Sequence, residues 1–316
     1  MSVAVEVIHI TDPGCPWAYS ANPAFTVLRW RYGDQLSWRL VMIGLSEEAG
    51  QYEARGYTPG RMAQAYRRFR RLGMPFATDM RSHVPSTGRA CRAVVATRMV
   101  QPDREWAAFR ALQSAWFTTA LELDEDESIE RVLRGVAGVD SDAVMAALDS
   151  EEVESAYQAD RAEARTAAGS PTDFQGKAAS TDGAVRYTAP SLIFRDGERR
   201  LEGGGFQPVQ AYDVLIANLD PTLDRRAPAP DAEQVLAAFP DGITTQEVAA
   251  VMAADLVPVD RNAAEEALIE LMAQDRALRI PAGNDALWRA PSAGRSPGEG
   301  RSPTGAGALA SSAASD

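Results

Sequence analysis

A nine-residue stretch near the amino terminus, Thr-Asp-Pro-Gly-Cys-Pro-Trp-Ala-Tyr at residues 11–19, places the strongest constraint on the fold. Residues 3–10 before it are β-formers, and residues 21–32 after it have an amphipathic pattern. Pro16 fits the first helical turn, where a missing backbone N–H costs nothing. The stretch therefore predicts a strand, a tight turn and a helix whose amino terminus lies at Cys15.

Cys15 is the candidate catalytic residue of this stretch. The unpaired backbone N–H groups and the dipole of a helix amino terminus favour an anion. A cysteine pKa of about 8.5 in water falls to between about 3.5 and 7.5 in such a position. The pattern therefore predicts a nucleophilic thiolate at neutral pH. The alternative is an inert cysteine that packs in the core, because cysteine is among the most buried residue types.

Composition limits the class of protein and its partners. The chain has 316 residues, 45% of them apolar and 24% charged, which is typical of a soluble globular protein with one large or two ordinary domains. A net charge of −12 argues against a nucleic acid or an anionic membrane as partner. No stretch approaches the roughly 18 consecutive apolar residues of a membrane span, and residues 1–10 lack the features of a signal peptide. We therefore expect a cytoplasmic protein whose two cysteines are reduced.

The order of the predicted strands and helices indicates an α/β fold. Residues 36–43 have the pattern of a second buried strand, and a strand–helix–strand unit is parallel and right-handed in nearly all cases. From residue 57 to residue 169 the pattern is helical, which predicts an all-helical insertion over about residues 57–180. Two strands then form a hairpin around Asp196-Gly197, before a last helix. The expected helices of the insertion are 58–71, 86–100, 103–123, 127–136, 140–148 and 151–168, the hairpin strands are 191–195 and 200–202, and the last helix is 207–219.

Several segments in this order resemble the DsbA form of the thioredoxin-like fold. Residues 12–19 are Asp-Pro-Gly-Cys-Pro-Trp-Ala-Tyr, and the FrnE-like branch of that family usually carries Asp-Pro-x-Cys-Pro-Trp-Cys-Tyr. Residues 38–45 are similar to the family's second strand, residues 109–126 to its long insertion helix, and residues 187–194 to its cis-proline loop and third strand. The resemblance covers about residues 1–220 and implies a thioredoxin-like sheet with a helical insertion.

The resemblance also implies roles for the residues of the site. Cys15 corresponds to the exposed, attacking cysteine, and Pro190 to the cis-proline that packs against it. Pro16, Trp17, Ala189 and Pro190 would contact the substrate, with Ala189 offering its backbone. The residues alone favour another state for Pro190, an ordinary trans proline at the start of an edge strand, because only about 5 to 6% of X–Pro bonds are cis.

Ala18 departs from the family pattern, which has a resolving cysteine at this position. A second thiol releases a mixed disulfide from within, at high effective concentration, and alanine cannot do this. Cys15 therefore suits monothiol chemistry: isomerisation of disulfides, or exchange or transfer with a small thiol as co-substrate and without a tightly bound cofactor. Such a thiol–disulfide oxidoreductase would act on a small thiol or a protein disulfide. The alternative function is a redox-silent scaffold for protein interactions.

Two further residues are auxiliary candidates. Cys91 lies in a helix start that is close to the active site in the family, so it either resolves Cys15 or faces the core beside Val94 and Val95. His9 is either a satisfied strand residue or a group that tunes Cys15. The chain has only two histidines and no Cys-x-x-Cys, Walker or dinucleotide pattern, so we expect no metal site.

The carboxyl-terminal part departs from the family pattern. Residues 221–230 have linker composition, and residues 231–291 have the pattern of three helices and a hairpin, which looks like a winged-helix domain. Residues 227–291 contain eleven acidic residues against four arginines, a net charge of −7, so phosphate repulsion argues against DNA. We expect residues 231–291 to contact a protein partner or a second copy, and residues 292–316 to be a disordered tail. The helices are expected at 231–238, 244–254 and 261–276, and the hairpin at 278–289.

Overall fold

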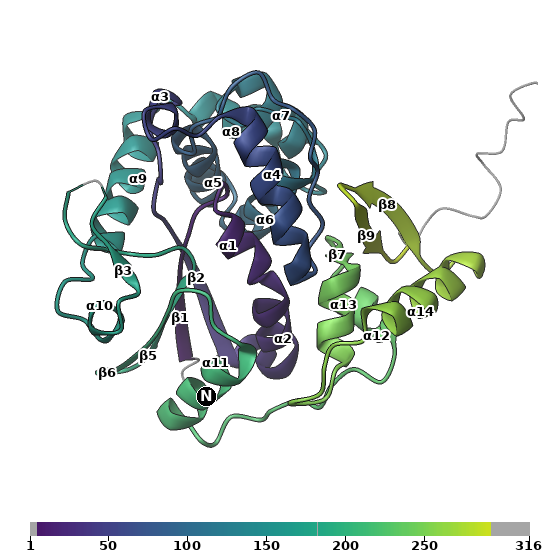
Figure 1. Cartoon of the computed structure of the whole chain (residues 1–316). Coiled ribbons are helices and arrows are strands. Elements are labelled where there is room, and N and C mark those ends of the chain that lie inside the picture. The colour runs from purple at the N-terminus through teal and green to yellow at the C-terminus, as the bar shows by residue number, and fades with distance from the viewer. Residues whose placement is uncertain (1–4, 182, 292–316) are drawn as a thin grey trace, which may run out of the picture.

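The computed structural model describes residues 5–181 and 183–291 and contains a four-stranded sheet in the order β2, β1, β5, β6 (Figure 1). β1 (Val5–Thr11) lies parallel to β2 (Leu36–Met42), as predicted for a strand–helix–strand unit. β1 also pairs antiparallel with β5 (Ser191–Asp196), which turns at Gly197 into β6 (Arg199–Gly204). Gly197 has a φ of 56°, a conformation that favours glycine.

The connection from β1 to β2 contains two helices rather than one. Cys15 is the N-cap residue of α1 (Pro16–Ser20), and Pro16 occupies its first turn, as predicted. α2 (Asn22–Tyr32) follows directly and leads through a 3-10 turn at residues 33–35 into β2. Pro23 causes the break between α1 and α2, because proline cannot donate the backbone hydrogen bond that would continue α1.

Side chains of β1 alternate between the two faces of the sheet, as the pleat of a strand requires. On one face Val7 packs with Phe25 of α2 and with Tyr212 of α11 (Val209–Leu219). On the other face Ile8 packs in a cluster with Ala164 of α9 (Glu151–Ala164). β1 is therefore buried on both sides, at the centre of the domain.

The segment from residue 57 to residue 169 is helical and contains no strand, as predicted. Polar caps begin several of its helices: the hydroxyl of Thr58 accepts a hydrogen bond from the N–H of Arg61, and that of Ser150 from the N–H of Val153. α6 ends at Thr118 rather than near residue 123, because Thr119 is extended. The helices between β2 and α9 are α3 (Gly50–Glu53), α4 (Pro59–Phe69), α5 (Gly88–Val100), α6 (Glu105–Thr118), α7 (Asp126–Arg134) and α8 (Ser141–Ala147).

The structure adds short elements between α9 and β5, and the prediction of an all-helical insertion up to about residue 180 is wrong at its end, because residues 178–179 form a strand. α10 (Pro171–Phe174) is a single turn, and β3 (Ala178–Ala179) pairs antiparallel with β4 (Arg186–Tyr187). Elements this short hold too little of an apolar period for a sequence to reveal them. β4 ends just before Ala189, so this pair holds the segment that enters the candidate site.

The carboxyl-terminal part contains three helices and a three-stranded sheet in the order β7, β9, β8 (Figure 1). The three helices and the hairpin lie where the sequence predicts them. The two-residue strand β7 is not predicted, and it pairs with β9. The elements are α12 (Ala232–Ala238), β7 (Ile243–Thr244), α13 (Thr245–Met252), α14 (Arg261–Ala273), β8 (Leu278–Ala282) and β9 (Asp285–Arg289).

The carboxyl-terminal part packs against α2. Val27 and Trp30 of α2 belong to the same buried cluster as Trp288 of β9. The predicted linker, residues 221–230, forms no helix or strand, yet it is held against α2, because the indole N–H of Trp30 donates to the carbonyl of Ala227 at 2.8 Å. The predicted tail, residues 292–316, lies outside the described residues. In the part of the chain that the structure describes, no helix is long and apolar enough to cross a membrane.

Candidate active site

The Cys15 sulfur lies against the segment that precedes β5. Cys15 follows the turn after β1, where its N–H donates to the carbonyl of Asp12 at 3.1 Å. Its Sγ donates to the carbonyl oxygen of Ala189 at 3.2 Å. The Ala189–Pro190 peptide bond is cis, as the family resemblance implies and contrary to what the residues alone favour. The fold thus brings together Cys15 and the Ala189–Pro190 bond, which are far apart in the sequence.

Burial raises the pKa of the Cys15 thiol to about 12. The side chain is only 5% exposed, within a cluster that includes Ile10 and Tyr187. Hydrogen bonds from the backbone of Ala18 and Trp17 act to lower the pKa, as predicted for a helix amino terminus, but desolvation outweighs them. The prediction of a thiolate at neutral pH is therefore wrong for the free protein, whose Cys15 is a protonated thiol.

Asp12 supports the turn that carries Cys15. Its buried carboxylate accepts hydrogen bonds from the N–H of Gly14, the N–H of Leu45 and the hydroxyl of Thr87, each at 2.8 Å. Burial raises the pKa of Asp12 despite these donors. Asp12 is not among the predicted site residues, and its place three residues before Cys15 is the one signal in the sequence that points to it. Asp12 ties the turn to the start of α5.

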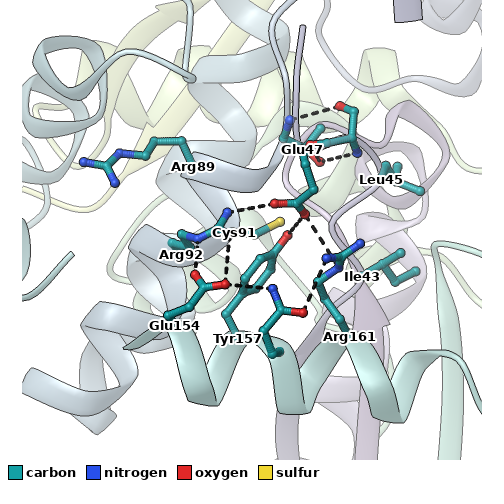
Figure 2. A network of polar contacts seen from close by, with 12 residues as sticks. Ile43, Leu45, Glu47, Arg89, Cys91, Arg92, Glu154, Tyr157 and Arg161 are labelled. Atoms are coloured by element: carbon teal, nitrogen blue, oxygen red, sulfur yellow. Dashed lines mark hydrogen bonds and ion pairs between the residues drawn. The ribbon is translucent and has the colours of Figure 1, made fainter. Parts of the chain in front are cut away.

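Cys91 lies in the core of the insertion, close to Asp12. Its thiol is 3.5 Å from an Asp12 carboxylate oxygen, and it clusters with Val94 and Val95, as one of the two interpretations predicts. Figure 2 shows the Cys91 sulfur beside Tyr157 and Glu47, which are joined by a hydrogen bond from the tyrosine hydroxyl. Burial and the charge of Asp12 raise the pKa of Cys91 well above its ordinary value. Both cysteines are free thiols, and pairing of Cys91 with Cys15 stays a prediction.

His9 is a core residue, but it is not satisfied. Its ring lies among aromatic side chains, with centroids 4.6 Å from Phe25 and 6.0 Å from Phe109. Neither ring nitrogen has a hydrogen-bond partner among the described residues. Burial, reinforced by the charges of Arg29 and Arg110, lowers the pKa of His9 to about 3. A neutral imidazole brings no positive charge that could lower the pKa of Cys15.

An aromatic surface lies next to Cys15. Trp17 is 43% exposed and makes edge contacts with Phe69 of α4 at 4.9 Å and with Phe206 at 5.7 Å between ring centroids. Phe206 is itself 38% exposed, and it follows β6 directly. The sequence analysis missed Phe69 and Phe206, since only the fold brings them to Trp17. The three rings and the half-buried Pro16 offer an apolar platform beside the sulfur.

The sheet order, the helical insertion and a cysteine that faces a cis-proline define the chain as a thioredoxin-like protein of the DsbA type. The profile of the DSBA-like thioredoxin domain matches residues 6–189, more than half of the chain, and the chain belongs to this family. The predicted fold class is therefore confirmed.

Solved structures of other proteins share this fold. A proposed protein disulfide isomerase from Nitrosomonas europaea has a TM-score of 0.52 at 18% identity, over 68% of this chain and 97% of its own. A proposed DsbA oxidoreductase from Streptomyces coelicolor has a TM-score of 0.51 at 17% identity, over 72% of this chain and 97% of its own. No curated protein sequence matches the chain. Within residues 5–181 and 183–291, no group of three or more His, Cys, Asp or Glu side chains is arranged to hold a metal ion.

Proposed function

We propose that this protein catalyses thiol–disulfide exchange through the single thiol of Cys15. The observation that carries the proposal is the position of the Cys15 sulfur, at the amino terminus of α1 and in contact with Ala189 beside the cis bond to Pro190. Membership of the DSBA-like family supports thiol–disulfide exchange in general. Ala18, in the position where that family usually has its second cysteine, supports a monothiol mechanism.

In the first step the Cys15 thiolate attacks one sulfur of a disulfide R–S–S–R′. The mixed disulfide Cys15–S–S–R forms, and the R′ thiolate leaves and takes up the proton that Cys15 has lost. Backbone hydrogen bonds from Trp17 and Ala18 stabilise the charge that develops on the Cys15 sulfur. The thiol–disulfide pair exchanges partners, so no outside oxidant or reductant is consumed.

The second step needs a thiol from outside the site. A small thiol, or another cysteine of the same substrate, attacks the substrate sulfur of Cys15–S–S–R and releases the Cys15 thiolate, which regains a proton. When that cysteine belongs to the substrate, the substrate is isomerised without net oxidation. The exposed rings of Trp17 and Phe206, together with Pro16, Ala189 and Pro190, would hold the substrate chain beside the sulfur.

The test is the isomerisation of scrambled ribonuclease with and without reduced glutathione. We expect wild type to be active, Cys15→Ser to be inactive with or without glutathione, and reduced glutathione to speed the release of the mixed disulfide from wild type but not from Ala18→Cys. Cys91→Ser is the control and should keep wild-type activity. Activity in Cys15→Ser, an inactive wild type, or loss of activity in Cys91→Ser would each contradict the proposal.

A redox-silent interaction scaffold is the second candidate function. The burial of Cys15 and its pKa of about 12 favour this alternative, because a protonated thiol is a poor nucleophile. The two candidates differ in whether a substrate disulfide reacts. A mixed disulfide trapped on Cys15 by glutathione disulfide at pH 9, seen by intact mass, supports exchange, and an unmodified Cys15 supports the scaffold.

The proposal includes finer assignments. The segment Asp-Pro-Gly-Cys-Pro-Trp-Ala-Tyr supports the FrnE-like branch, and the order helix, strand, helix, helix, strand, strand supports a winged-helix-like domain at residues 231–291. Exposed apolar side chains on α14 and β8, among them Ile269 and Leu278, and the negative charge of this domain support a protein partner or a second copy rather than a nucleic acid. A small thiol of the cytoplasm would serve as co-substrate. The reaction would need no tightly bound cofactor.

A further inference from the structure

A cavity of about 670 Å³ lies between α2, α6 and the carboxyl-terminal part of the chain. Its volume falls in the range of small-molecule binding pockets, roughly 300–1,000 Å³. None of the predicted site residues lines it. Cys15 follows the carboxyl end of β1, whereas the cavity reaches Leu36 at the amino end of the parallel strand β2. The cavity extends from there along α2 to Tyr19 of α1, and it is a second site because none of the Cys15, Ala189 and Pro190 side chains lines it.

Arg29 of α2 lines this cavity without an acceptor for its donors. Its guanidinium carbon lies 3.6 Å from the ring centroid of Trp106 and 4.4 Å from that of Trp38. These rings cover a face of the guanidinium, but its N–H donors point outward in its plane and need acceptors. The guanidinium makes no hydrogen bond or ion pair with any residue that the structure describes, and Nε is inaccessible to solvent. Burial and the charge of Arg110 lower the pKa of Arg29 to about 9, so it stays charged at neutral pH.

Three carboxylates line the cavity, those of Asp34, Asp241 and Glu247, and none of them forms an ion pair with Arg29; the oxygens of Glu247 are already bound. Glu247 of α13 accepts two hydrogen bonds from Arg110, at 2.7 and 2.9 Å. It also accepts from the hydroxyl of Thr26 at 2.8 Å and from the backbone N–H of Thr244 at 3.0 Å. Glu247 therefore neutralises Arg110 and leaves the positive charge of Arg29 uncompensated.

A second donor at the cavity wall lacks a partner. The indole N–H of Trp38 is buried and has no hydrogen-bond partner among the described residues. A buried donor without an acceptor costs about 1–3 kcal/mol, and more where the group is charged. Two unpaired donors at one cavity, one of them on a cation, call for an occupant that brings acceptors and negative charge.

Part of the wall is apolar, and this part defines the body of the occupant. α6 contributes the small side chains of Ala107, Ala111 and Ala115, and the carboxyl-terminal part contributes Phe239 and Leu287. An inorganic anion would leave most of this surface in contact with water. An apolar body with one acidic group would satisfy both the wall and Arg29.

We propose that this cavity binds a small organic anion, a carboxylate or sulfonate on an apolar body, with the acid group on Arg29 and the body between α6 and the carboxyl-terminal part. The acid accepts the in-plane donors of Arg29 and lies beside Trp38, whose ring packs on the same guanidinium. The ligand contacts both parts of the chain, so it also holds them together. The site is independent of thiol chemistry at Cys15.

The test is isothermal titration with 1-naphthoate, decanoate and the neutral isostere 1-naphthamide. We expect at least one of the two anions to bind saturably to wild type, with one molecule per chain, and Arg29→Leu to weaken that binding at least tenfold. 1-Naphthamide should bind no more tightly to wild type than to Arg29→Leu, since it carries no charge for Arg29.

Three further variants keep the test decisive. Ala111→Trp fills the cavity and should abolish binding even if Arg29→Leu is poorly folded. Arg67→Gln, on the exposed face of α4, is the matched control and should bind as wild type does. Cys15→Ser should also bind normally, which separates this site from the exchange site. Wild type that binds neither anion, or Arg29→Leu or Ala111→Trp that binds as tightly as wild type, overturns the proposal.

Discussion

A titratable group is desolvated near each end of the central sheet, and the two groups differ in their charge at neutral pH. At the carboxyl ends of β1 and β2, burial raises the pKa of Cys15 to about 12, and the thiol donates its hydrogen to the carbonyl of Ala189. At the amino end of β2, burial lowers the pKa of Arg29 to about 9. Desolvation disfavours the charged form in both cases, yet at neutral pH the thiol is uncharged and the guanidinium is still a cation.

The difference follows from how far the ordinary pKa of each side chain lies above neutral pH. A buried thiol avoids the charge by staying protonated, and the protein then needs to supply only one acceptor for its S–H group. The ordinary pKa of arginine is so high that even a large downward shift of the pKa leaves the guanidinium charged. The surroundings of a buried arginine must therefore supply an anion. A charged group without a counterion inside the protein therefore points to one from outside. The following predictions test this contrast, from the largest effect to the smallest.

Cys15 should react far more slowly in the folded protein than in the unfolded chain. A pKa near 12 instead of 9 leaves roughly a thousandfold less thiolate at pH 7. In a Cys91→Ser background, we expect iodoacetamide labelling at pH 7 to be about a thousandfold slower than in urea. The folded rate should rise about tenfold per pH unit up to pH 10. A plateau near pH 7 would mean that the helix amino terminus dominates and that the contrast with Arg29 is wrong.

His9 should make the protein less stable at acid pH. Folded His9 binds a proton only below about pH 3, whereas unfolded His9 binds one below about pH 6.5. Unfolding therefore takes up a proton, and the stability lost between pH 6.5 and 4.5 through this residue is about 2 kcal/mol. Urea unfolding of His9→Phe should lack this part of the pH dependence.

The control for His9 is the other histidine. Despite burial, the hydrogen bond to Asp124 and the neighbouring carboxylates raise the pKa of His83. His83→Gln should therefore change the pH dependence with the opposite sign, because folded His83 holds its proton at a higher pH than unfolded His83 does. Equal slopes for wild type and His9→Phe would show that His9 is protonated in the folded state.

Arg31 is the matched counterpart of Arg29 on α2. It is 4% exposed and pairs with Asp213 of α11 and with Asp255 after α13. Arg31→Gln leaves these carboxylates with Arg225, which already binds both, and Asp213 also with the hydroxyl of Tyr32. We expect a loss of about 2 kcal/mol, below the 3–5 kcal/mol for a fully broken buried pair, because Arg225 remains. Urea unfolding measures this loss of unfolding free energy. A variant Arg31→Gln that is more stable than wild type would contradict the claim that Arg31, unlike Arg29, is stabilised by its carboxylate partners.

The sequence predicts the Cys15 end of the molecule better than the Arg29 end. The strand, the turn and the helix that carry Cys15 are neighbours in the chain, so their residue types and spacing define the site before the fold is known. The cis state of Pro190 required the family resemblance, because an isolated X–Pro pair favours trans. The pKa of Cys15 could not be predicted, since the side chains that bury it, such as Tyr187, come from distant segments.

At the Arg29 end the decisive partners are distant in the sequence. Arg29 and Arg31 look alike in the segment Leu-Arg-Trp-Arg-Tyr, and only the fold brings Asp213 and Asp255 to Arg31 and no carboxylate to Arg29. The cavity itself depends on how the carboxyl-terminal part packs against α2 and α6, which no local pattern encodes. The predicted linker at residues 221–230 assigns the residues on the two sides of the cavity to separate domains, so the domain prediction gives no reason to expect a site between them.

Arg29→Leu should stabilise the free protein, in contrast to Arg31→Gln. Removing a half-buried cation that has no counterion among the described residues relieves its desolvation cost, while the contacts with Trp38 and Trp106 are partly kept by the leucine. We expect a gain of about 1 kcal/mol in urea unfolding without ligand, because the lost cation–π contacts offset part of the relief. The gain should vanish or reverse when 1-naphthoate or decanoate is present, since only wild type is then stabilised by binding. Destabilisation of the free protein by Arg29→Leu would mean that the aromatic rings alone compensate the charge, so that the cavity needs no anion.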